Sequence, residues 1–122
     1  MNTTPTSPDT LTAQQYREAF QKIHDQLTDK QRAMLRTHYH APERKITARQ
    51  MAEAVGFPSY SAANLQYGVV GGLLCEILGQ EDGSDRLFVL AHFIRPHTEG
   101  NAEWLWQMRE PAAQALQELG WI

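Results

Sequence analysis

Three copies of one helix-start signal constrain the fold of this chain most strongly. A threonine is followed three residues later by a glutamine at Thr12–Gln15, Thr28–Gln31 and Thr47–Gln50. In such a capping box the threonine hydroxyl accepts from the backbone amide three residues on, and the glutamine side chain reaches back to the threonine amide. The sequence therefore predicts three helices that begin at these positions.

Apolar spacing predicts where these helices run and adds a fourth. A stripe of Tyr16, Phe20, Ile23 and Leu27 fits the first helix, and helices over about residues 29–39 and 48–55 follow. A fourth helix, over about residues 61–78, carries Leu65, Val69, Leu73 and Ile77 on one stripe. Val70, Leu74 and Leu78 flank that stripe, so we expect the second half of this helix to be almost wholly buried. The pair Gly71–Gly72 inside this helix predicts close packing against another backbone, or a kink.

The period of the apolar residues changes after the polar turn at 79–85. Residues 87–94 form a continuous run rich in aromatic and branched residues, and residues 104–108 alternate. Together they predict an antiparallel hairpin with a long loop over about 96–103. Pro111 suits the first turn of a last helix, which Gly120 ends. The predicted fold class is α+β: a helical bundle with a helix-turn-helix-like core, a β-hairpin that makes it winged-helix-like, and a C-terminal helix.

Length and composition fit one domain. The chain has 122 residues, of which 42% are hydrophobic. Residues 1–10, rich in Thr, Pro and Ser, are predicted to be a disordered tail, and residues 11–122 a single domain. The N-terminus lacks the basic start and apolar stretch of a secretory signal, and no apolar run is long enough for a membrane span, so we expect a cytoplasmic protein without membrane contact.

The segment from Thr47 to Tyr67 has the outline of a helix-turn-helix. A short helix and a tight turn around Gly56 precede a helix with a polar start, which would offer its first turns to the major groove of double-stranded DNA. Side-chain amides pair with adenine edges, hydroxyls reach phosphates, and cations supply most of the affinity. The candidate DNA-binding residues are Arg44, Lys45, Arg49, Ser59, Tyr60, Ser61, Asn64, Gln66 and Tyr67.

Charge leaves two function classes open. Residues 10–50 carry eight basic side chains against four acidic ones, whereas residues 51–85 carry five acidic side chains and no basic one. The helix over about residues 61–78, which would read the DNA bases, has no Lys or Arg. The hairpin and its loop, which would form the wing of a winged helix, offer His97, Glu99 and Glu103. The alternative to DNA binding is therefore a protein-interaction domain, such as an inhibitor, immunity or assembly partner, that uses the acidic turn Glu81–Asp85 and the wing.

No pattern predicts catalysis, a metal or another cofactor. His38 and His40 lie where the second helix ends, which the helix dipole explains, and neither they nor His92 and His97 have an established ligand spacing. Cys75 lies in the most apolar stretch, where an inert thiol is expected, and a lone cysteine excludes an intrachain disulfide.

The three tryptophans are predicted to belong mainly to the core. Trp104 and Trp106 share one face of the second hairpin strand, and Trp121 closes the chain. The alternative is that these tryptophan rings stack on nucleic-acid bases or fill a pocket of a protein partner.

Four segments resemble a group of small bacterial proteins: Ile46–Phe57, Ala63–Gly68, Glu103–Trp106 and Ala115–Trp121. In that group the same segments occur alone or as an accessory domain beside HNH-type restriction endonucleases. The resemblance implies an association with DNA restriction or mobile elements. We therefore expect an accessory role beside a restriction or phage-defence enzyme, with a nuclease as the protein partner. This chain has no HNH motif of its own, so the resemblance implies a non-enzymatic role.

Overall fold

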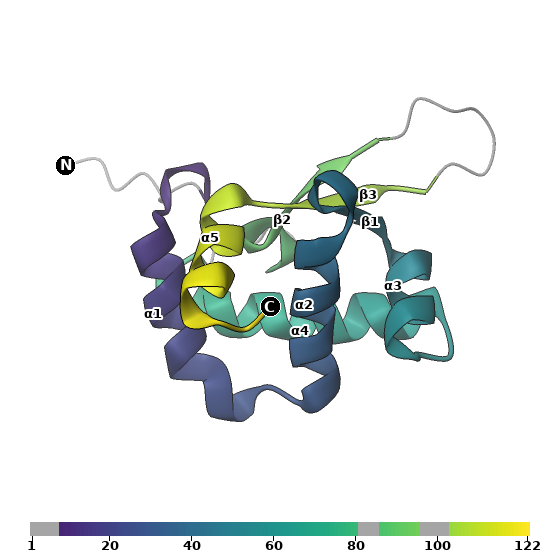
Figure 1. Ribbon diagram of the computed structural model, residues 1–122, viewed down its shortest axis with the longest axis horizontal. Coiled ribbons are helices and arrows are strands. Elements are labelled where there is room, and N and C mark those ends of the chain that lie inside the picture. Colours follow the sequence, from purple (N-terminus) through teal and green to yellow (C-terminus); the bar gives the residue numbers. More distant parts are fainter. Residues whose placement is uncertain (1–7, 81–85, 96–102) are drawn as a thin grey trace.

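The fold is mostly helical α+β, with five α-helices and a small three-stranded antiparallel sheet in the part of the chain that is described (Figure 1). The computed structural model describes residues 8–80, 86–95 and 103–122. The α-helices are α1 (Ala13–Ile23), α2 (Asp29–His40), α3 (Ala48–Val55), α4 (Tyr60–Leu78) and α5 (Glu110–Leu119). The strands are β1 (Lys45–Thr47), β2 (Ala91–Ile94) and β3 (Leu105–Met108), and short 3₁₀ helices include η3 (Pro42–Arg44) and η4 (Arg86–Val89).

The predicted helix starts are confirmed. Thr12, Thr28 and Thr47 each cap a helix, and in each case the capping box is complete in both directions. Helix α3 ends at Gly56, whose φ of 91° is the left-handed conformation that glycine adopts without strain. The local signals in the sequence therefore suffice to place α1, α2 and α3.

The sheet differs from the predicted hairpin in two ways. A third strand, β1, pairs with β3, so the strand order is β1-β3-β2 and Ile46 lies opposite Trp106. The expected first hairpin strand over residues 87–94 is wrong in its first half, because residues 86–89 form η4 and only Ala91–Ile94 pair with β3. The predicted loop over 96–103 and the acidic turn at 81–85 lie almost entirely outside the described residues.

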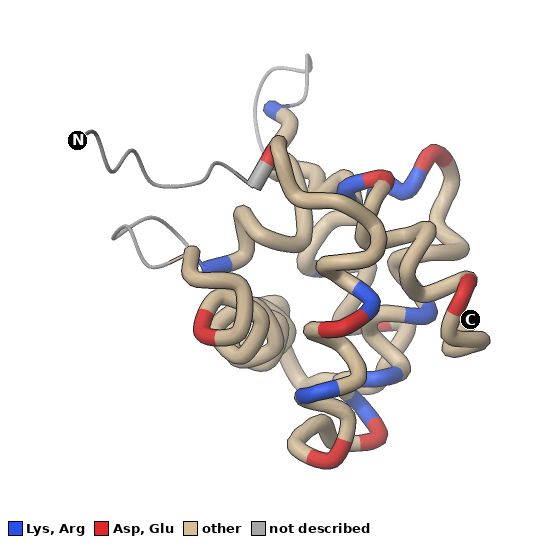
Figure 2. Tube along the Cα trace, turned by 90° about the vertical axis from the view of Figure 1, so that its left-hand side faces the viewer, with Lys and Arg blue, Asp and Glu red and all other residues tan. Residues whose placement is uncertain are grey.

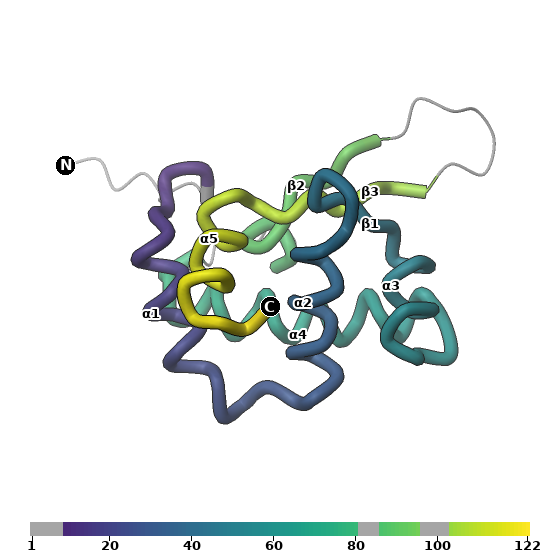
Figure 3. The backbone as a smooth tube through the Cα atoms, in the orientation of Figure 1, coloured from purple at the N-terminus to yellow at the C-terminus, as the bar shows by residue number. Residues whose placement is uncertain are grey.

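Helix α4 is the central element of the packing. It contacts α1, α2, α3 and η4, while α1 also packs against α5 (Figures 1 and 3). Its buried side includes Tyr67, Val70 and Leu74. The core thus lies around α4, and α3 lies at the same end of the molecule as the last residues of β2 and the first residues of β3 (Figure 1).

The second half of α4 is less buried than expected: Val70 and Leu74 are buried, but the stripe from Leu65 to Ile77 faces outward. Leu65 is 61% exposed and Ile77 is 40% exposed, while Val69 and Leu73 are only partly buried. The prediction fails for Ile77 because α4 carries apolar residues on all of its sides, so their spacing alone does not show which side faces the core. Gly71 lies on the side of α4 that packs against η4. A Cβ at this position would lie 2.5 Å from the Arg86 carbonyl oxygen in η4, which confirms the expected close approach of two backbones.

Candidate functional site

The first turns of α4 present part of the predicted DNA-binding set to solvent. Ser59 is the N-cap, and its hydroxyl accepts from the Ala62 amide at 3.2 Å. Tyr60 is 55% exposed, and Ser61 and Asn64 are exposed one turn apart. Helix α4 follows α3 after the four-residue turn 56–59, so these residues lie at the end of α4 next to that turn. Ser61, Asn64 and Tyr60 are therefore available to a partner.

Two predicted residues of the same helix point inward. The Gln66 amide oxygen accepts from the buried Gln31 side chain at 3.1 Å, which joins α4 to α2. Tyr67 is fully buried, and its hydroxyl lies 2.7 Å from His38 Nδ1. Both polar groups are thus used inside the protein, because residues 66 and 67 lie on the side of α4 that packs against α2.

His38 is a structural residue at the centre of the fold. Its Nε2 lies 2.8 Å from the Trp106 carbonyl oxygen and donates to it, so Nδ1 accepts from the Tyr67 hydroxyl. Burial lowers the pKa of His38 to about 4, and burial raises the pKa of the Tyr67 phenol above its usual range. The explanation of His38 as a charged helix terminus is therefore wrong: it is a neutral ring that ties α2, α4 and β3 together.

The three predicted cations lie in different places. The Arg49 side chain is 60% exposed and its Nε donates to Glu103 Oε2 at 3.2 Å. Lys45 Nζ lies 3.6 Å from a Glu43 carboxylate oxygen. Arg44 is held internally: Nη1 donates to the Tyr39 carbonyl oxygen at 2.6 Å, and the guanidinium lies 4.0 Å from the Tyr39 ring centre. Only Arg49 borders the exposed start of α4.

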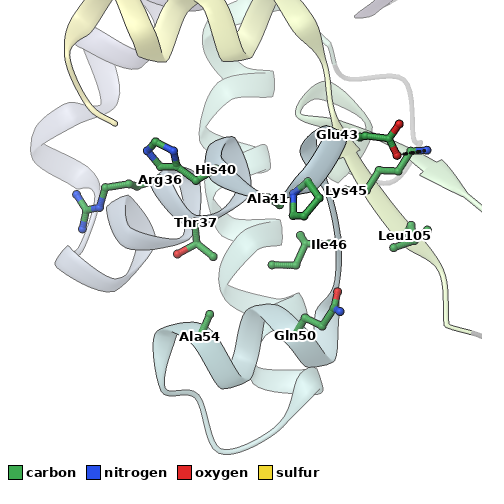
Figure 4. Close-up of a pocket in the computed structure, with 11 residues that line it drawn as sticks. Arg36, Thr37, His40, Ala41, Glu43, Lys45, Ile46, Gln50, Ala54 and Leu105 are labelled. Atoms are coloured by element: carbon green, nitrogen blue, oxygen red, sulfur yellow. Dashed lines mark ion pairs between the residues drawn. The ribbon is translucent and has the colours of Figure 1, made fainter.

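An open groove of about 770 Å³ lies between the end of α2, β1 and α3 (Figure 4). Arg36 and His40 line it from α2, and the Glu43–Lys45 ion pair lies at its other end. Gln50 and Ala54 line it from α3. Cations and a carboxylate therefore share this groove, and it has no uniformly basic lining.

The charged residues do not separate into one basic and one acidic face on the side that Figure 2 presents, where Lys and Arg alternate with Asp and Glu. Helix α4 has Glu76 as its single charged residue. One exposed cation that the sequence reasoning overlooked is Arg95, which directly follows β2. It gives the end of strand β2 an exposed positive charge.

A second hollow, of about 510 Å³, lies between the starts of α3 and α4 and the hairpin. It contains three predicted residues, Arg49, Tyr60 and Asn64, so the structure brings these together. The hairpin adds Trp104, which is 53% exposed, and Trp106, which is 4% exposed. The expectation that both tryptophans belong to the core holds for Trp106 and is wrong for Trp104, which precedes the first residue of β3.

Other site classes find no support in the described residues. Over residues 8–80, 86–95 and 103–122, no three His, Cys, Asp or Glu side chains gather in a way that holds a metal ion. None of the helices in those ranges has the length and hydropathy needed to cross a membrane. Cys75 is buried on α4 and its thiol lies 3.8 Å from the Arg86 carbonyl oxygen.

Comparison with protein families, with curated proteins and with solved structures finds no match to this chain.

Proposed function

We propose that this chain is a non-enzymatic DNA-binding module of the winged-helix type. The observation that carries the proposal is the element order α2, β1, α3, α4, β2, β3 together with the strand order β1-β3-β2. In a winged helix the helix in the place of α4 offers its first turns to the major groove, and the hairpin in the place of β2–β3 is the wing. The fold alone does not define a function, so the exposed residues must supply the rest of the argument.

The exposed side chains at the start of α4 suit a groove contact. The Asn64 amide has the donor and acceptor that pair with an adenine edge, and the Ser61 hydroxyl suits a phosphate or a base. Arg49 is free to contact a phosphate because an exposed ion pair such as Arg49–Glu103 contributes less than about 1 kcal/mol. Arg95 is the matching cation on the wing.

The sparse positive charge limits the affinity. Phosphate contacts supply nearly all non-specific binding, and α4 itself supplies none through a Lys or Arg. We therefore expect weak binding to duplexes of arbitrary sequence. The affinity that remains should depend on Ser61, Asn64, Arg49 and Arg95.

The double substitution Ser61→Ala with Asn64→Ala tests this assignment. One well-formed base contact is worth about 1–3 kcal/mol, so duplex affinity is expected to fall about tenfold or more. The measurement is fluorescence anisotropy with a pool of labelled duplexes, with circular dichroism to confirm folding. Gln117→Ala is the matched control, since Gln117 is exposed on α5, and it is expected to leave binding unchanged. Equal affinity of the double variant and the wild type would exclude α4 as the reading helix.

The proposed biological setting is DNA restriction or phage defence in the bacterial cytoplasm. It follows from the resemblance to proteins that occur beside HNH-type endonucleases, and it makes a nuclease the expected protein partner. In that setting the module supplies DNA contact and the partner supplies the cleavage chemistry.

A protein-interaction role is the second candidate, and a specific observation favours it. Leu65, Val69, Leu73 and Ile77 form a row of apolar side chains, four residues apart, on the outward side of α4. Rows with this spacing are the ridges by which helices pack against one another. This role would use the row on α4. The acidic turn Glu81–Asp85, which the charge pattern indicates for the same role, lies outside the described residues.

A further inference from the structure

The hollow between α3, α4 and the hairpin has an aromatic lining from two different parts of the chain. Tyr60 comes from α4, and Phe93, Trp104 and Trp106 come from the hairpin. Its volume of about 510 Å³ lies within the range of small-molecule sites.

Two of these rings are fixed and two are available. Trp106 is buried against Tyr67, with ring centres 5.3 Å apart, and Phe93 packs against Phe88 at 4.8 Å. Tyr60 and Trp104 each leave more than half of their surface to solvent. A hollow with a rigid aromatic floor and two exposed rings can take up a flat ligand with little rearrangement.

The polar groups of the hollow indicate which flat ligand fits. Arg49 offers donors, Glu103 offers acceptors and the Asn64 amide offers one of each. A cationic ligand would have to displace Arg49, whose guanidinium lies 5.9 Å from the Tyr60 ring centre and bonds to Glu103. An anionic ligand would meet the Glu103 carboxylate. The set therefore suits a neutral ring with donors and acceptors on its edge.

We infer that this hollow receives one unpaired nucleobase of bound DNA. The base stacks on Tyr60 or Trp104, and its edge is recognised by Asn64, Arg49 and Glu103. This inference rests on the proposed function, because Asn64 and Arg49 also belong to the proposed duplex contact. It goes beyond that function in giving the wing a recognition task and in naming an extruded or bulged base as the ligand.

The test compares two labelled duplexes that differ in one nucleotide. One is fully paired, and the other carries a single bulged 2-aminopurine, whose fluorescence falls when the base stacks on an aromatic ring. The wild type is expected to bind the bulged duplex about tenfold more tightly and to quench the probe. Trp104→Ala is expected to abolish the preference and the quenching while keeping affinity for the paired duplex. Ile77→Ala, an exposed apolar residue at the far end of α4, is the control and keeps both.

The outcomes separate this inference from the proposed function. Equal binding of the two duplexes without quenching overturns the inference and leaves duplex binding intact. If neither duplex binds, the proposed function fails, and a single-stranded oligonucleotide containing 2-aminopurine decides the inference: Trp104-dependent quenching supports it, and unchanged fluorescence overturns it. An arginine-rich peptide tests whether the hollow instead binds a basic protein segment through Glu103. If the tryptophan fluorescence responds to this peptide but not to the duplexes or the single-stranded oligonucleotide, the inference is overturned.

Discussion

Replacing Gly71 by alanine is expected to destabilise the protein by about 2–3 kcal/mol and to lower Tm by roughly 10 °C. A Cβ at this position would lie 2.5 Å from the Arg86 carbonyl oxygen and 2.9 Å from its carbonyl carbon. Backbone atoms cannot turn aside as a side chain does, so η4 must move away from α4. That cost exceeds the gain of about 1 kcal/mol that alanine brings to a helix interior.

The matched control for this prediction is Gly68→Ala, one turn earlier on α4. A Cβ there would lie 3.8 Å from an Arg86 guanidinium nitrogen, which is ordinary contact. We expect this variant to be more stable than the wild type by up to about 1 kcal/mol, because only the helix propensity changes. Thermal unfolding followed by circular dichroism measures both. A Gly71→Ala protein as stable as Gly68→Ala would show that α4 and η4 do not approach this closely.

The second large effect is a loss of stability on acidification that arises from His38. Burial lowers the pKa of His38 to about 4, against about 6.5 in an unfolded chain. Between these two values the unfolded state binds a proton that the folded state does not, so the free energy of unfolding rises with pH. We expect about 3 kcal/mol of stability to be present above pH 6.5 and to be lost as pH falls towards 4.

Urea unfolding at pH 7, 5.5 and 4 measures this contribution. His38→Gln removes the titrating group, so its stability is expected to fall much less over the same range, whatever its value at pH 7. His40→Gln is the control, since His40 is exposed two residues later, and it is expected to keep the wild-type slope. A His38→Gln profile parallel to the wild type would mean that another group carries the pH dependence.

The elements that the sequence predicts well are those whose signals are local. Thr12, Thr28 and Thr47 find their capping partners within three residues, so these starts do not depend on the rest of the fold. Strand β1 has only three residues, and its hydrogen-bond partners lie in β3 about 60 residues later. No local pattern in Lys45–Thr47 indicates that pairing, which is why the sheet has one more strand than expected.

The candidate site was predictable only in part for the same reason. Residue types and a helix start identify Ser61 and Asn64, but the side of α4 that faces inward depends on η4 and α2. Tyr67 therefore looked available, whereas a buried His38 from another helix bonds its hydroxyl. Trp104 looked like core because it alternates with Trp106, although it precedes the paired residues of β3.

The most direct test of the proposed function is the salt dependence of duplex binding, measured by fluorescence anisotropy with methylated and unmodified duplexes. Two or three phosphate contacts, with Arg49 and Arg95 as the main donors, predict a slope of log K against log salt of about −2 to −3. Arg49→Ala is expected to reduce the magnitude of that slope by about 1. No binding of either duplex even at low salt would contradict the account and make the apolar row on α4 the surface to pursue.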